Sequence, residues 1–157
     1  MDAQTHSPDS LLTDLIGQWH GIARTWFDPA TVVDESPIQG TFRQIGESRF
    51  VLYEYDGTFE GNPLHGAAIY GYNQWTQRFE GVWVDSFHMT TNIMVSTGIP
   101  GDSQLNVQGT YLVEGSLPWG WRTTIVVEHA DRLTLTCYNR APDGPETRAI
   151  EIQYHRV

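Results

Sequence analysis

About ten short runs of alternating apolar and polar residues follow one another after residue 17, and this alternation constrains the fold more than any other feature. Successive residues of a strand point to opposite faces of its sheet, so a period of two predicts half-buried β-strands. One face of the first run is expected to carry Trp19, Gly21, Ala23, Thr25 and Phe27. The other runs span residues 38–45, 49–60, 66–73, 79–85, 90–97, 104–113, 121–129, 133–139 and 147–155.

Short turn signals separate these runs, and no helical stretch interrupts them. The turns are rich in glycine, proline, asparagine and aspartate, as in Gly61-Asn62-Pro63. Even spacing with short connections indicates an antiparallel up-and-down meander. A sheet of about eight to ten strands curls, and closure into a barrel removes its exposed edges. A β-sandwich is the alternative, but it would need the long crossovers of a Greek key.

One short helix is expected before the strands, over about residues 8–16. Ser7 can cap its N-terminus, Pro8 suits the first helical position, and Gly17 ends it. Its apolar residues share one stripe, which would let the helix lie on a larger body: Leu11, Leu12, Leu15 and Ile16. With strands over about residues 17–156, the pattern predicts a single domain over residues 1–157.

The balance of charge excludes several classes of function. The chain has 19 acidic residues against nine basic ones, all of them arginine, and a formal net charge of −10. Nucleic-acid binding depends on neutralising phosphates with lysine and arginine, so neither nucleic acid nor an anionic membrane surface is an expected partner. The absence of lysine excludes Schiff-base catalysis and the phosphate-binding lysine of P-loop and kinase sites.

Membrane and metal sites are not expected either. No apolar run approaches the ~20 residues that span a bilayer, and the first residues lack the basic and apolar segments of a signal peptide. The expected location is therefore the cytoplasm. Cys137 is the single cysteine, so it cannot form an internal disulfide or a cysteine-rich metal site. The six histidines show no metal-binding spacing.

Residues at both ends of the chain resemble the lipocalin signature. Gly17-Gln18-Trp19 follows the short helix and opens the first strand, and Arg156 ends the last one. In lipocalins the tryptophan of Gly-x-Trp closes one end of the barrel, and an arginine from the last strand packs across it. The resemblance implies these closure roles for Trp19 and Arg156, and a guanidinium over an indole is worth about 0.5–2 kcal/mol.

A second resemblance covers nearly the whole chain. Its order of short motifs is similar to the bacterial domain of unknown function family 1579, placed among the calycins. The motifs are Leu15-Ile-Gly-Gln-Trp-His-Gly21, Arg43-Gln-Ile-Gly46, Arg49-Phe50, Ile69-Tyr-Gly-Tyr-Asn73, Trp83-Val-Asp-Ser86, Ser96-Thr-Gly98, Gly109-Thr-Tyr111, Pro142-Asp-Gly144 and Tyr154-His-Arg156. Asn73 departs from the aspartate frequent there. The resemblance implies a small barrel with an internal cavity and no particular activity.

Aromatic residues gather between residues 42 and 87, and alternate members must point into a closed barrel. Trp83 and Asp85 are two residues apart, so they share a face. A carboxylate inside a barrel needs a partner, for which Arg122 is a candidate. We expect a cavity for a small, largely apolar molecule, lined by Tyr53, Tyr72, Trp83, Asp85, Met94 and Arg122.

Other functions stay open beside this binding module. Asp85 could serve an enzyme as general acid or base, although the sequence favours binding over catalysis. A filled barrel could act through its surface, with a homodimer among the open oligomeric states. Haem is a further alternative implied by the resemblance, because some small barrels related to this fold hold haem through a histidine on a late strand, and His155 lies on the last strand. If Arg156 faces inward, however, its neighbour His155 should face outward.

Overall fold

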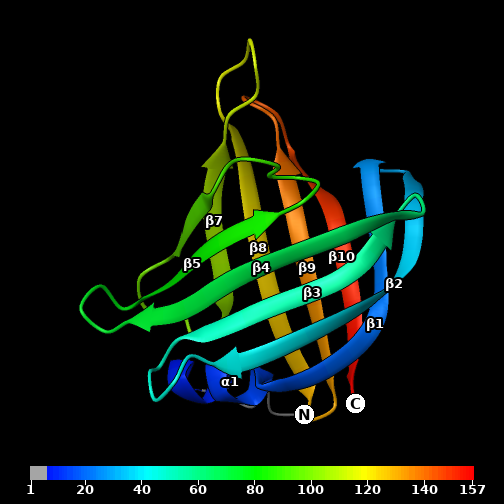
Figure 1. The fold of residues 1–157 in the computed structure, drawn as a ribbon. Helices are drawn as coiled ribbons and strands as arrows, with labels where there is room; N and C mark the ends of the chain where they lie inside the picture. The colour runs from blue at the N-terminus through cyan, green and yellow to red at the C-terminus, as the bar shows by residue number, and fades with distance from the viewer. Residues whose placement is uncertain (1–6) are drawn as a thin grey trace.

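Hydrogen-bonded strands follow one another in chain order around a single closed sheet (Figure 1). This computed structural model describes residues 7–157. In the described part, one helix, α1 (Pro8–Leu15), precedes ten antiparallel strands, and β10 returns to pair with β1. The strands are β1 (Gly17–Asp28), β2 (Thr31–Gln44), β3 (Val51–Phe59), β4 (Asn62–Asn73), β5 (Arg78–Asp85), β6 (Met94–Gly98), β7 (Leu105–Tyr111), β8 (Trp119–His129), β9 (Arg132–Arg140) and β10 (Glu146–Arg156).

The predicted fold class is therefore confirmed, whereas several element boundaries differ from the expectation; β4, for example, begins at Asn62 rather than at residue 66. Strand β2 begins at Thr31 rather than at residue 38, because the Asp28 carboxylate accepts the N–H groups of Ala30 (2.8 Å) and Thr31 (3.0 Å) and makes a tight turn. Residues 90–93 were expected to start a strand, but they belong to the turn between β5 and β6.

The predicted face of the first strand holds only for part of its length. Trp19, Ala23 and Thr25 are buried, but Phe27 is 66% exposed and Trp26 is buried in its place. The pairing of β1 with β2 shifts register on both sides of Trp26. Such an irregularity inserts a residue and reverses the alternation beyond it, and sequence period alone does not report that. The Arg148 guanidinium covers Trp26, 4.1 Å from the ring centroid.

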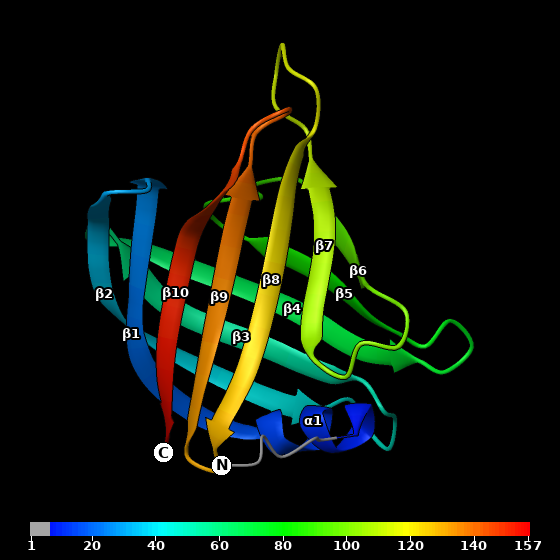
Figure 2. The same cartoon turned by 180° about the vertical axis from the view of Figure 1, so that it is seen from behind.

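Helix α1 lies across one end of the barrel (Figures 1 and 2). Ser7 is its N-cap, and Leu11, Leu12 and Leu15 are buried against the strands. The Trp19 indole N–H donates to the carbonyl of Leu15 (2.9 Å). This end of the barrel is therefore filled by side chains of the helix and of the first strand.

The interior next to this end is packed with aromatic rings. Phe42 stacks on Tyr53 with ring centroids 4.3 Å apart, and the Tyr53 and Tyr154 hydroxyls lie 2.7 Å apart. Burial holds the pKa of both phenols well above the ordinary value. Because these rings occupy the barrel beside α1, any cavity must lie toward the opposite end.

Candidate ligand-binding site at the open end of the barrel

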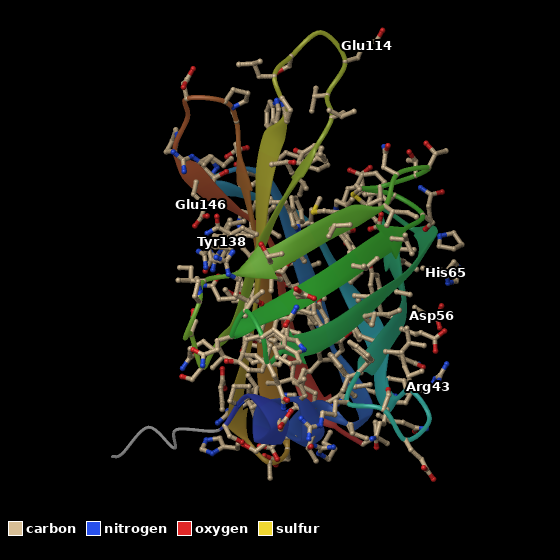
Figure 3. All side chains as sticks on the ribbon, turned by 90° about the vertical axis from the view of Figure 1, so that its left-hand side faces the viewer. Arg43, Asp56, His65, Glu114, Tyr138 and Glu146 are labelled. Atoms are coloured by element: carbon tan, nitrogen blue, oxygen red, sulfur yellow. The ribbon has the colours of Figure 1, made fainter. Side chains whose placement is uncertain are left out.

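The end opposite α1 carries the loops 86–93, 112–118 and 141–145 (Figure 1), and Glu114 lies at the tip of the second (Figure 3). Below them is a cavity of about 180 Å³, whose wall includes Trp83, His88, Met94, Tyr111 and Trp121. A smaller hollow of about 50 Å³ lies deeper in the barrel. The two share Thr25, Trp83 and His88, so they lie next to each other.

Asp85 is the last residue of β5, and its side chain is fully buried beside the cavity. Its carboxylate accepts the backbone N–H groups of Phe87 (3.2 Å) and Met89 (2.7 Å). The Tyr55 hydroxyl donates to it at 3.3 Å, and His88 Nδ1 lies 2.5 Å from Oδ2. These four contacts supply what a buried carboxylate requires, and they hold the 86–93 loop over the barrel.

His88 lies beside a pair of stacked indole rings. Trp83 and Trp121 are stacked with centroids 5.4 Å apart, and the imidazole is 5.6 Å from Trp83 and 5.8 Å from Trp121. Trp83 is itself oriented by a hydrogen bond from its indole N–H to the Tyr55 hydroxyl (2.9 Å). Among the described residues, none makes a hydrogen bond with His88 Nε2.

The Trp121 ring lines the cavity, whereas its indole N–H is fully buried. Within residues 7–157 only it and Arg78 Nε are buried side-chain polar atoms without a hydrogen-bond partner. Burial raises the pKa of the nearby Cys137 thiol to about 12, whereas hydrogen bonds from Thr123 and from the Trp121 indole lower it. The indole N–H is therefore directed toward the Cys137 sulfur, which is a weak acceptor.

The loop that carries His88 holds a strained residue. Thr90 has a φ of 50°, in the left-handed region that a β-branched residue avoids at a cost of about 1–2 kcal/mol. Its N–H donates to the Asp85 carbonyl (3.1 Å). Both the carboxylate and the carbonyl of Asp85 thus maintain a loop conformation that the local sequence disfavours.

The structure gathers only some of the residues expected at the site. Trp83 and Met94 line the cavity, Asp85 lies behind His88, and Tyr53 lines the deeper hollow. Tyr72 packs edge-on against Phe79, with centroids 5.1 Å apart, and lines neither space.

The expected pairing of Arg122 with Asp85 is wrong. Arg122 lies on the outer wall, where it donates to Glu146 at 2.6 Å and stacks over Tyr138 at 4.1 Å. Figure 3 shows Tyr138 and Glu146 close together on that side. The reason is strand geometry: the neighbouring Trp121 faces inward, so Arg122 must face outward. His88 takes the place beside Asp85 instead.

Sequence reasoning missed His88, although one signal was present. An aspartate that ends a strand commonly accepts N–H groups from the next few residues, which brings a side chain at the third position back toward it. His155, the candidate haem ligand, is exposed, while its neighbour Tyr154 is fully buried. His155 therefore faces away from the interior, and it cannot hold a haem there.

The two ends of the barrel differ. Arg156 lies over Trp19 with its guanidinium carbon 4.2 Å from the ring, and α1 covers that end, whereas the other end holds the cavity. These features define a small closed antiparallel barrel with an internal cavity, consistent with a calycin-like fold. The chain belongs to the family described as "Protein of unknown function (DUF1579)", whose model matches residues 4–156.

Solved structures with the same fold are distant in sequence. Rv2717c from M. tuberculosis is 16% identical, with 97% of this chain and 98% of that chain covered and a TM-score of 0.62. The S-type phycobiliprotein lyase CPES from Guillardia theta is 11% identical, with 97% and 93% covered and a TM-score of 0.59. No curated protein matches the sequence significantly. The described residues contain no helix long and apolar enough to cross a membrane.

Proposed function

We propose that this protein binds a small, largely apolar molecule in the cavity at the open end of its barrel. The observation that carries the proposal is the interior cavity of about 180 Å³, which the stacked indole rings of Trp83 and Trp121 line. Aromatic rings that line an enclosed space are typical of small-molecule sites.

The rest of the wall suits an apolar ligand. Trp83, Met89, Met94 and Tyr111 present rings and thioethers, and the polar side chains of the wall include Asn139 and Thr147. An engineered cavity of roughly 150 Å³ holds one benzene molecule, so a space of about 180 Å³ fits one ring with a short substituent. A haem has four pyrrole rings and needs several times this space. The cavity therefore favours a small ligand over haem and over a filled barrel.

The predicted site residues take different parts in this proposal. Trp83 and Met94 contact the ligand, Tyr53 bounds the deeper hollow, and Asp85 holds the loop that carries His88. Trp19 and Arg156 keep the opposite end closed. The likeness to a phycobiliprotein lyase concerns the fold, so the proposal rests on the cavity rather than on that protein's activity.

Calorimetric titration with acetophenone tests the proposal, because this probe is one ring with a short substituent. Trp121→Phe replaces an indole of the cavity wall with a smaller ring, so it should weaken acetophenone binding about two- to fivefold through lost contact surface. Trp75→Phe is the matched control, because Trp75 is 97% exposed and lies outside the cavity.

Each outcome is informative. A lack of acetophenone binding by the unmodified protein would contradict the proposed cavity function. Equal affinities of the unmodified protein and Trp121→Phe would show that the probe binds outside this cavity, which would also contradict the proposal.

A further inference from the structure

We propose that the ligand of this cavity is a small aromatic molecule of the phenol class, whose O–H donates a hydrogen bond to His88 Nε2. Asp85 positions His88 and determines which of its two ring nitrogens can accept. The inference deepens the proposed function and rests on it, because the ring of the phenol occupies the same cavity.

The two oxygens of the Asp85 carboxylate have different partners. Oδ1 accepts the backbone N–H groups of Phe87 (3.2 Å) and Met89 (2.7 Å). Oδ2 accepts from the Tyr55 hydroxyl (3.3 Å) and lies 2.5 Å from His88 Nδ1. The Asp85 side chain is 0% exposed, so these protein groups are its partners. An ionised carboxylate only accepts hydrogen bonds, and Nδ1 must therefore carry the proton between them.

The other nitrogen of His88 is left as an acceptor. In a neutral imidazole one nitrogen donates and the other accepts, so a proton fixed on Nδ1 leaves the lone pair on Nε2. No described residue makes a hydrogen bond with Nε2. His88 lines both hollows and Asp85 lines neither, so the imidazole extends from the buried carboxylate to the cavity. Nε2 lies on the side of the ring that is turned away from Asp85.

Aromatic contacts hold the imidazole in this orientation. Phe87 packs edge-on against it with centroids 4.7 Å apart, and Phe87 is itself stacked on Phe59 at 4.4 Å. The rings of Trp83 and Trp121 lie 5.6 Å and 5.8 Å from the imidazole. An acceptor that is fixed before binding reduces the conformational entropy that binding must overcome.

Other polar side chains of the cavity wall are bonded within the protein. The Tyr111 hydroxyl donates to Asn139 Oδ1 at 2.8 Å, and Arg148 donates to Glu151 at 2.9 Å. The wall therefore combines aromatic surface with a nitrogen acceptor at His88. A phenol matches both features, because its ring packs on aromatic surface and its O–H is a donor.

A second aspartate–histidine pair provides a matched control. On the outer wall, His65 Nδ1 contacts Asp56, and Figure 3 shows the two side chains facing each other. These side chains are 62% and 74% exposed, and neither residue lines the cavity or the deeper hollow. A substitution that acts through the cavity should therefore have no effect when it is made at His65.

Calorimetric titration with phenol and toluene tests the inference at pH 8, where an ordinary imidazole is neutral and phenol keeps its proton. The two probes have nearly the same shape, but only phenol has an O–H. His88→Asn can still donate an amide N–H to Asp85, whereas it has no counterpart of Nε2. This variant should weaken phenol binding about three- to tenfold more than toluene binding, the equivalent of one hydrogen bond. His65→Asn should change neither affinity.

Asp85→Asn should exchange the roles of the two ring nitrogens. Its Oδ1 can still accept from the loop N–H groups, whereas the amide N–H in place of Oδ2 donates to His88 Nδ1. The imidazole proton then moves to Nε2, which becomes a donor. The ratio of phenol affinity to acetophenone affinity should fall at least threefold, because acetophenone only accepts. Nitrogen NMR of the imidazole should show the proton on Nδ1 in the unmodified protein and on Nε2 in the variant. An unchanged affinity ratio would overturn the positioning role of Asp85.

The inference and the proposed function fail in distinguishable ways. If His88→Asn weakens phenol and toluene binding equally, or if Nε2 carries a proton in the unmodified protein, the phenol class is overturned and the binding function stands. If phenol, toluene and acetophenone all fail to bind, the cavity function itself is overturned, and this inference falls with it.

Discussion

Arg156, at the end of the last strand, lies over the ring of Trp19, at the start of the first strand, with its guanidinium carbon 4.2 Å from the ring centroid. Its nitrogens donate to the carbonyls of Ile16 (2.6 Å), Asp14 (2.8 Å) and Ala130 (2.7 Å). One side chain thereby satisfies carbonyls at the C-terminal end of α1, where unpaired carbonyls collect, and joins the two ends of the chain.

Arg156→Ala should therefore destabilise the protein by about 2–4 kcal/mol. The stacking is worth about 0.5–2 kcal/mol, and the rest comes from carbonyls left without their charged donor. Urea unfolding followed by circular dichroism measures the change. Arg43→Ala is the control, because that exposed arginine makes only a 3.6 Å contact with Glu54. Similar midpoints for the two variants would contradict the structural role of Arg156.

Gly66→Ala should distort the site, although Gly66 itself does not line the cavity. A Cβ at this position would lie 2.1 Å from the Tyr55 hydroxyl oxygen, so the ring that donates to Asp85 and accepts from Trp83 must move. We expect a loss of about 1–3 kcal/mol on urea unfolding and weaker acetophenone binding. Gly120→Ala should have little effect, since the nearest atom to its new Cβ would be 3.6 Å away. Unchanged binding by Gly66→Ala would argue against the Tyr55 link.

Stability should fall in alkaline solution, beginning near pH 9. Burial raises the pKa of Cys137 from 9.0 to about 12, so between these values only the unfolded chain loses the thiol proton. The stabilising contribution is complete below pH 9 and disappears as the pH rises toward 12, at about 1.4 kcal/mol per pH unit. Urea midpoints from pH 8 to pH 11 check this, and Cys137→Ala should show a shallower decline. Buried Tyr70, whose pKa is also raised, adds to the decline at higher pH.

The outer pair of Arg122 and Glu146 should show the opposite dependence. The hydrogen bond from Arg122 is the main cause that lowers the pKa of Glu146 below 4.5, so its contribution is present above that pH and lost as the carboxylate is protonated. Glu146→Gln should cost about 0.5–1 kcal/mol at pH 7 and less at pH 3. Glu114→Gln, on the exposed loop tip, should cost nothing at either pH. A constant difference across pH would contradict the ion pair.

Much of the fold was predictable, because the strands, the turns and the ends of the helix each follow from a local pattern of residues. The alternation gave ten strands, the turn residues separated them, and Ser7, Pro8 and Gly17 bounded the helix. The site was predicted only in part. Asp85 was expected inside from its spacing to Trp83, but Arg122 was expected as its partner, and His88 was overlooked.

The sequence by itself determined the strand period, the helix ends and the family, because each of these depends on neighbouring residues or on motif order. Only the tertiary structure decided the shift of register at Trp26, the outward face of Arg122 and the meeting of Asp85 with His88. Those features depend on how strands pair and how the barrel closes. Cross-strand pairing and the space left inside a closed sheet are collective properties, which no local pattern specifies.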